Sequence, residues 1–404
     1  MRCSRNAEPG RPGDCSRRTF GALPKLAARR SRRQIPSSTL PGTVIRSALL
    51  VISFTVPAGW SSADTQAYQL RSLVDDLHWP SSVARLPDGS FLVTERPGRL
   101  LRIYPGGARR YVSGTPPTLF AGEGGYLDVV LDPQFRNNSV IYLSYAEGDE
   151  RANGVSVLRG RLVENRLDQG RRILRVAADK RTTLNYGGRL LTAGEDELLV
   201  TVGDGFLHRA AAQGTDTELG KILRVRTTGQ PAGILSADGK ETLRIWALGH
   251  RNPQGLARNR EDGLVYAVDH GPRGGDELNI LRGGDNHGWP LVSTGVEESG
   301  AMVTPFRTIA GMADPLWTWT PAIGPSGLAF YDGTAFPAWR GSLLVGGLIS
   351  RDVRRLRMVR QAVVQEETLF AELEKPIRDV RVFGGDLYLL TGGERGTLVQ
   401  VLPR

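Results

Sequence analysis

Cysteine is nearly absent from this sequence of 404 residues, since the only two, Cys3 and Cys15, lie close to the N-terminus. Residues 64–404 therefore contain no thiol, which excludes a disulfide framework, a cysteine nucleophile and a cysteine-ligated zinc site in that part of the chain. Histidine is also scarce, and its five widely spaced residues disfavour a histidine-rich metal centre.

Long apolar runs and nucleotide-binding motifs are missing as well. No apolar run approaches the roughly 20 residues that a membrane-spanning helix needs, so we expect no integral membrane segment in the mature chain. The sequence has no Gly-x-x-x-x-Gly-Lys-Ser/Thr loop, no Gly-x-Ser-x-Gly elbow and no Gly-x-Gly turn that opens a helix after a strand. Nucleotide-binding, lipase and Rossmann functions are therefore not predicted.

The net charge of +10 is concentrated at the N-terminus. Residues 1–63 contain eleven Arg and Lys against only Glu8 and Asp14, which leaves 41 basic and 40 acidic residues in the remainder. A nucleic-acid binder carries its positive charge on the folded domain. The body of this chain lacks that excess, so no nucleic-acid partner is expected.

The basic N-terminal segment has the pattern of a secretory leader. Arg46 precedes an apolar stretch at 47–56, and small residues follow up to Ala63. A positive flank, a short apolar core and a small-residue end are typical of a signal peptide. We therefore expect export to the periplasm or the exterior, with cleavage near Ala63. Because the basic flank is unusually long, a translation start near Val44 is a further hypothesis.

Short apolar runs recur along residues 64–404, and several follow a turn rich in Gly, Pro, Asp or Glu. A repeat of roughly 40–50 residues, loosened by insertions, is typical of a β-propeller, whose blades each contain four strands. No helical apolar face exceeds about two turns, which disfavours an α/β fold. We predict an all-β, six-bladed propeller over residues 64–404, with a sandwich or β-helix as the alternative and a surface excursion at about 283–316. The six strand cores are residues 91–94, 141–144, 198–201, 264–267, 343–346 and 387–390.

Polar clusters lie where strands are expected to end, at residues 249–255, 270–277 and 283–290. Taken alone they are compatible with ordinary turn chemistry. In a propeller, however, strand ends surround the mouth of the central channel. The residues by themselves therefore predict an exported propeller with a polar mouth rich in Arg, Asn and Asp.

The same clusters, in this order, resemble the soluble aldose sugar dehydrogenases of the glucose/sorbosone dehydrogenase family. The resemblance implies a six-bladed propeller that binds pyrroloquinoline quinone (PQQ) and calcium and oxidises a sugar. It also implies a sugar substrate and a periplasmic electron acceptor as partners. The matching stretches are 77–80, 93–99, 122–128, 187–190, 219–223, 249–255, 270–277, 325–330, 336–341 and 377–380.

The resemblance assigns roles to particular residues. It implies that the backbone carbonyls of Gly271 and Pro272 hold the calcium ion, as suits a cation that prefers oxygen ligands. It further implies that Arg251 and Asn252 contact the cofactor, that Arg251 also steadies charge developing on it, and that Arg378 binds it.

Several positions depart from the family pattern. Asn185 stands at the position of the family's catalytic His, and asparagine cannot act as a general base. Asp204 matches the carboxylate that orients that His and, on this alignment, has nothing to orient. Glu123 stands where a cofactor-contacting Gln is usual, and Ile349 and Pro376 replace two expected cations. These exchanges predict weakened PQQ binding.

Three functions follow as alternatives. The first is a PQQ- and calcium-dependent oxidoreductase acting on an aldose or a related alcohol, with Asp204 or His208 as a substitute base. The second is a non-catalytic propeller that binds a sugar, an envelope glycan or a protein; an enzyme with another cofactor or a hydrolytic reaction is a third. Trp317 and Trp319 are either a sugar-stacking wall or packing between blades.

Overall fold

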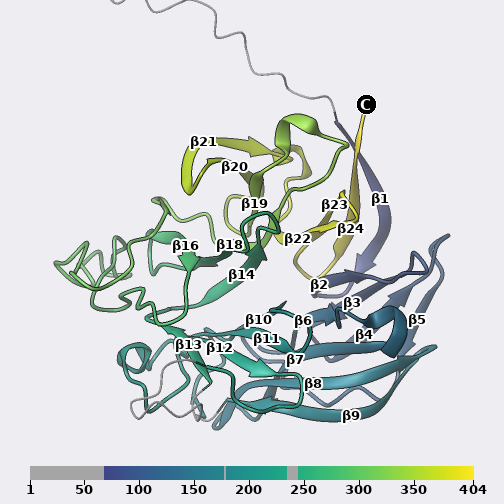
Figure 1. The fold of residues 1–404 in the computed structure, drawn as a ribbon, viewed down its shortest axis with the longest axis horizontal. Coiled ribbons are helices and arrows are strands. Elements are labelled where there is room, and N and C mark those ends of the chain that lie inside the picture. The colour runs from purple at the N-terminus through teal and green to yellow at the C-terminus, as the bar shows by residue number, and fades with distance from the viewer. Residues whose placement is uncertain (1–67, 177–178, 234–243) are drawn as a thin grey trace, which may run out of the picture. The chain divides into compact units, whose positions relative to one another are not determined.

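The computed structural model describes residues 68–176, 179–233 and 244–404. They form six four-stranded antiparallel sheets arranged as the blades of a propeller (Figure 1), which confirms the predicted fold class. The only helices in the described part are α1 (Phe135–Asn138) and three short 3-10 turns, η1 (Arg209–Gln213), η2 (Pro337–Trp339) and η3 (Ala371–Leu373). The strands are β1 (Tyr68–Leu77), β2 (Pro80–Arg85), β3 (Phe91–Glu95), β4 (Arg99–Ile103), β5 (Arg109–Val112), β6 (Tyr126–Leu131), β7 (Val140–Gly148), β8 (Asn153–Val163), β9 (Arg166–Arg175), β10 (Gly187–Thr192), β11 (Glu197–Val202), β12 (Lys221–Arg226), β13 (Ile245–Leu248), β14 (Pro253–Arg258), β15 (Val265–Asp269), β16 (Asp276–Leu281), β17 (Trp317–Trp319), β18 (Pro325–Phe330), β19 (Ser342–Gly347), β20 (Val353–Val359), β21 (Ala362–Leu369), β22 (Ile377–Phe383), β23 (Asp386–Thr391) and β24 (Gly396–Pro403).

The repeat seen in the sequence corresponds to one strand of each blade. All six predicted cores fall on the second strand from the axis, namely β3, β7, β11, β15, β19 and β23. Five blades are built from four consecutive strands. The sixth has the order β1-β24-β23-β22, so the first strand of the described chain completes the blade made by the last three. Antiparallel pairing of Tyr68 with Pro403 and of Leu77 with Gly396 closes the ring.

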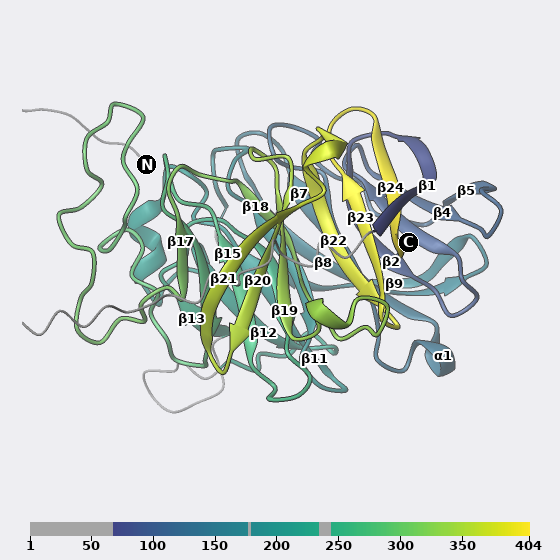
Figure 2. The ribbon, with the colours of Figure 1, turned by 90° about the horizontal axis from the view of Figure 1, so that it is seen from above.

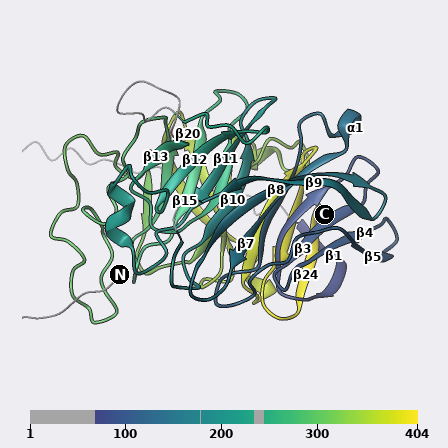
Figure 3. The same ribbon diagram turned by 90° about the horizontal axis from the view of Figure 1, so that it is seen from below.

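The hydrophobic core is divided among the blade interfaces. Each of the six buried clusters joins residues of two neighbouring blades, as where Tyr142 of β7 and Val200 of β11 belong to one cluster. The sheets therefore stack face to face around the axis, as the two turned views show (Figures 2 and 3). This packing leaves few open edges, which is the main advantage of the architecture.

The innermost strands approach one another closely at the axis. A Cβ atom on Gly255 would lie 2.4 Å from the carbonyl oxygen of Ser326, and one on Gly327 would lie 2.4 Å from a carboxylate oxygen of Asp379. Only glycine fits at these two positions. The ends of the inner strands are thereby drawn together, which brings the loops that precede them into one small area.

The connection between β16 and β17 contains no strand or helix and projects from the body (Figure 2), as expected for the excursion. No helix in the described part of the chain is long and apolar enough to span a membrane. The predicted leader, its cleavage near Ala63 and the alternative start at Val44 lie outside the described residues and stay predictions.

Candidate functional site

A cavity of about 220 Å³ opens where the inner strands begin. Its wall includes the first residues of β2, β10 and the loops before β14 and β22, so it lies at the mouth of the channel. The polar and aromatic side chains that line it are Trp79, Arg96, Glu123, Tyr186, Asn252, Gln254, His270 and Arg378. The structure therefore brings together three residues that the resemblance had assigned to the cofactor.

Asp269, at the end of β15, fixes the Arg251-Asn252 turn. Its carboxylate accepts hydrogen bonds from the backbone N–H groups of Arg251 (3.0 Å) and Asn252 (2.6 Å) and contacts Nδ1 of His250 at 3.1 Å. The Asn252 side-chain oxygen accepts from the Gly187 backbone N–H at 3.0 Å. Asn252 is therefore held rigidly in the cavity wall, with its position set by two neighbouring blades.

Asn185 lies just before β10 in the left-handed backbone region, with φ of 50°, which asparagine tolerates better than most residues. Its amide Nδ2 donates to Asp204 Oδ1 at 2.8 Å, and the Trp289 indole N–H donates to Asp204 Oδ2 at 2.8 Å. The expectation that Asp204 has nothing to orient is therefore wrong, because the asparagine amide occupies that place. Burial raises the pKa of Asp204, while the hydrogen bonds from Asn185 and Trp289 oppose the rise.

Glu123 is exposed, and one of its oxygens faces the Asn185 loop. Oε2 accepts a hydrogen bond from the backbone N–H of Asn185 at 2.8 Å and a long one from Asn252 Nδ2 at 3.5 Å. Arg96 holds the loop around it, because its Nε donates to the Gly124 carbonyl at 3.0 Å. The carboxylate thus stands between Asn185 and Asn252.

Two cationic side chains, Arg96 and Arg378, line the cavity. Arg378 donates from Nη1 to Gln254 Oε1 at 3.0 Å. Burial lowers the pKa of Arg378 to about 9, and the like charges of Arg189 and Arg96 add to this effect. Positive charge that its neighbours do not fully neutralise favours an anionic ligand. Of the two expected cation positions, Pro376 lines the cavity, whereas Ile349 is exposed and does not.

The Gly271-Pro272 turn connects β15 to β16. The Gly271 backbone N–H donates to Asp276 Oδ1 at 2.9 Å, and a Cβ atom on Gly271 would lie 2.2 Å from the Gly274 carbonyl oxygen. Position 271 in this turn therefore has room only for glycine. No group of three or more His, Cys, Asp or Glu side chains suited to a metal occurs among the described residues. Any metal held at this turn would depend on backbone carbonyls and on ligand oxygens.

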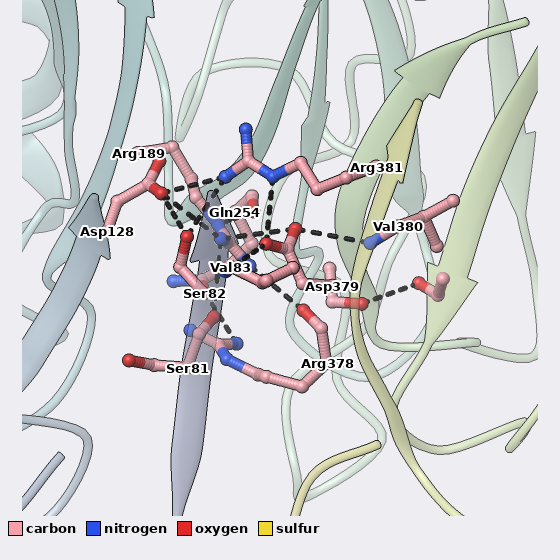
Figure 4. Close-up of polar contacts among 12 residues, drawn as sticks. Ser81, Ser82, Val83, Asp128, Arg189, Gln254, Arg378, Asp379, Val380 and Arg381 are labelled. Atoms are coloured by element: carbon pink, nitrogen blue, oxygen red, sulfur yellow. Dashed lines mark hydrogen bonds and ion pairs between the residues drawn. The ribbon is translucent and has the colours of Figure 1, made fainter. Parts of the chain in front are cut away.

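A buried ionic network closes the channel beneath the cavity (Figure 4). Arg381 contacts Asp128 at 2.7 Å and Asp379 at 2.8 Å, while Arg189 contacts the same carboxylates at 3.9 and 3.4 Å. Burial alone would raise the pKa of Asp379, but Arg381 and Arg189 hold it below its usual value. The two pairs balance in charge, so the excess positive charge remains at the cavity above them.

Sequence reasoning missed several residues at this site, among them Arg96, Trp79 and Lys180. Trp79 lines the cavity with φ of 49°, an unusual conformation for a bulky side chain and more so for one that precedes a proline. Buried Lys180 donates to the carbonyls of Thr182 and Leu184, both at 2.7 Å, and so fixes the segment before Asn185. The Trp-Pro pair was within a matching stretch, but its backbone conformation leaves no mark in the sequence.

Three other candidates do not contribute to the cavity. His208 precedes η1 and is absent from the cavity wall. The indole N–H groups of Trp317 and Trp319 donate to Glu366 at 2.9 and 3.2 Å, and both rings belong to the cluster between the fourth and fifth blades. The two tryptophans therefore pack between blades.

Comparison with known proteins decides the family. A family model described as Glucose / Sorbosone dehydrogenase matches residues 77–400. The chain belongs to this family. It is 35% identical to aldose sugar dehydrogenase YliI of Escherichia coli over 342 aligned residues. The alignment covers 82% of this chain and 92% of that protein. The crystal structure of the soluble aldose sugar dehydrogenase of Escherichia coli in the apo form matches with a TM-score of 0.79 and 34% identity, over 84% of this chain and all of that one.

A more distant member of the family is quinoprotein glucose dehydrogenase B of Acinetobacter calcoaceticus, 27% identical over 279 residues, which cover 60% of this chain and 57% of that protein. The family consists of sugar oxidoreductases, so the expectation that the chain is an oxidoreductase is confirmed. The roles of individual residues are a separate matter, because the chain differs from the family pattern at several of them.

Proposed function

We propose that the protein is an exported oxidoreductase that uses PQQ and calcium to oxidise an aldose or a related alcohol. The observation that carries this proposal is the cavity itself, which is lined by the side chains of Arg96 and Arg378 together with the fixed amide of Asn252. Sugar dehydrogenase and quinoprotein activities of the relatives point the same way.

The residues present fit an anionic quinone cofactor. PQQ carries three carboxylates, and the positive charge around Arg378 is not fully neutralised by its neighbours. Glu123 introduces one negative charge, but its Oε2 is turned towards the Asn185 N–H and the Asn252 amide. The charge conflict predicted from the sequence is therefore smaller than a count of substitutions suggests.

When bound, PQQ supplies a two-electron acceptor, and calcium polarises the group it binds as a Lewis acid. Arg251 does not itself line the cavity, but Asp269 fixes its backbone next to the wall residue Asn252, from where its guanidinium would stabilise negative charge at the cofactor. Asn185 lies behind the cavity wall, where its amide N–H donates to Asp204 and its backbone N–H donates to Glu123. Asn185 thus positions Glu123 and cannot itself take a proton.

A calorimetric titration of PQQ into the chain beginning at residue 64, with millimolar calcium and with EDTA as the matched control, tests the proposal. We expect saturable binding that EDTA abolishes, followed by aldose-dependent dye reduction by the loaded protein. Absence of binding at high micromolar PQQ would refute it. An electron acceptor in the periplasm completes the proposed cycle, and detection of the protein in a periplasmic extract tests its export.

A non-catalytic propeller that binds a sugar, an envelope glycan or a protein is the second candidate. Asn185 favours it, because no titratable group stands at that position. Calcium-dependent sugar binding without any dye reduction in the presence of PQQ would decide for this function.

A further inference from the structure

Glu123 is the only carboxylate that lines the cavity in the described part of the chain. Its Oε2 accepts two hydrogen bonds from the wall, and its Oε1 has no hydrogen-bond partner among the described residues. An exposed carboxylate with a free oxygen in the wall of a ligand cavity is able to accept a proton from a bound ligand.

The neighbouring acid cannot do so. Both oxygens of Asp204 are occupied, since Oδ1 accepts from Asn185 Nδ2 and from the Phe206 N–H at 2.7 Å, and Oδ2 accepts from the Trp289 indole. Asp204 is 1% exposed and does not line the cavity. Its geometry suits a residue that positions Asn185.

Asn185 lies behind the cavity wall, since it is 3% exposed and does not line the cavity. The 2.8 Å hydrogen bond from its backbone N–H fixes Oε2 of Glu123 and leaves Oε1 available to a ligand in the cavity. Arg96 and Lys180 interact electrostatically with Glu123. A carboxylate with one fixed and one free oxygen in a ligand cavity is the arrangement that proton abstraction from a bound hydroxyl requires.

We propose that Glu123 is the proton acceptor of this enzyme, a proposal that rests on the proposed function. As the sugar carbinol is oxidised, its C–H bond breaks and the electron pair leaves as hydride to the quinone cofactor. The O–H bond breaks at the same carbinol, and its proton forms a new O–H bond on the Glu123 carboxylate. The carbinol becomes a carbonyl, and Glu123 later releases the proton to water through the open mouth.

The test begins with Glu123→Gln, which keeps the shape and an oxygen able to accept from Asn185. We expect kcat to fall by about 10²- to 10⁴-fold, the usual contribution of a general base. The Kd for PQQ, measured by calorimetry, stays the same or decreases, since a negative charge has been removed. Glu298→Gln, at an exposed glutamate outside the cavity, is the matched control and keeps wild-type kcat.

Two further readouts separate a catalytic role from a structural one. Infrared difference spectra of the loaded protein mixed with aldose should show the stretch of a newly protonated carboxyl in the wild type and lack it in Glu123→Gln. The double variant Glu123→Gln/Asn185→His should regain at least tenfold in kcat and acquire an acidic limb near pH 6.5, since histidine at that position supplies a base beside Asp204.

The outcomes divide clearly. If the wild type binds no PQQ, the proposed function fails before any variant is compared, and the role of Glu123 fails with it. If the wild type binds PQQ and turns over, but Glu123→Gln keeps more than a third of kcat and the same infrared spectrum, the Glu123 proposal alone is overturned. PQQ binding without any aldose turnover also overturns it.

Discussion

Replacing Arg189 with methionine tests whether the buried network beneath the cavity holds the propeller together. Arg189 is 2% exposed and contacts Asp379 at 3.4 Å and Asp128 at 3.9 Å. After the change, Arg381 alone faces both carboxylates, so one buried negative charge loses its partner. The same guanidinium also donates to three backbone carbonyls on three different blades, those of Gln254 (2.7 Å), Arg378 (2.9 Å) and Ser81 (3.4 Å).

The magnitude follows from these contacts. Breaking a buried ion pair by removing one partner costs about 3–5 kcal/mol. Each buried carbonyl left without its donor adds about 1–3 kcal/mol at most, and the two effects overlap because one guanidinium serves both. We therefore expect the free energy of unfolding to fall by about 5 kcal/mol, a large fraction of the roughly 5–15 kcal/mol that a folded domain possesses.

Urea denaturation followed by tryptophan fluorescence measures the change. Arg258→Met is the matched control, because Arg258 also lies on an inner strand but has no ion pair in the described part of the chain. The control should lose less than about 1 kcal/mol. The double variant Arg189→Met/Asp379→Asn should recover part of the loss, since it removes the unpaired charge. A loss in Arg189→Met no larger than in Arg258→Met would refute the reasoning.

Three other predictions concern the site and its surroundings. Gly271→Ala places a Cβ atom 2.2 Å from the Gly274 carbonyl oxygen and should abolish calcium-dependent PQQ binding in calorimetry, whereas Gly170→Ala, where the nearest atoms of Leu158 lie at ordinary contact distances of 3.6 and 3.8 Å, should leave it unchanged. Trp79→Ala should raise the PQQ Kd by about tenfold and Trp79→Phe by less than about threefold, because a flat ring still lines the cavity; equal effects would contradict a stacking role. Burial holds the pKa of His287 well below its usual 6.5, so the unfolded chain binds the proton first and stability is lost as the pH falls below about 6.5. His287→Phe should therefore show a smaller drop in urea midpoint between pH 7.5 and 5.5 than the wild type, and an equal drop would contradict this assignment.

The sequence predicted the blades well because their signal is local. The second strand of each blade is apolar on both faces and lies between turn residues, as in Phe91–Glu95, which is entirely buried. Closure of the ring was not predicted, since β1 pairs with β24 at the opposite end of the chain. Pairing over such a distance leaves no periodic trace, and β1 itself is largely exposed.

For the site, the residues that a motif could locate were placed correctly in or beside the cavity, as with Asn252 and Arg378. The sequence-based expectations that the structure corrected were those that depended on where a side chain lies. Ile349 is exposed and does not line the cavity, and Asp204 retains a partner because the short amide of Asn185 reaches it. The roles of Arg96 and Trp79 arise from loops of different blades that meet in space, which no spacing along the chain reveals.

Because β1 and β24 pair directly, the blade at which the chain begins makes little difference to the stability of the ring. Tyr68 and Pro403 are directly paired in antiparallel register, so the two strands run as the arms of a hairpin that lacks only its turn. A short turn inserted after Pro403 would let the chain re-enter at Tyr68, and a circularly permuted protein could begin instead at an exposed turn such as Asp262-Gly263. A tag appended at Arg404 emerges beside the start of β1, so it lies next to the seam on which ring closure depends.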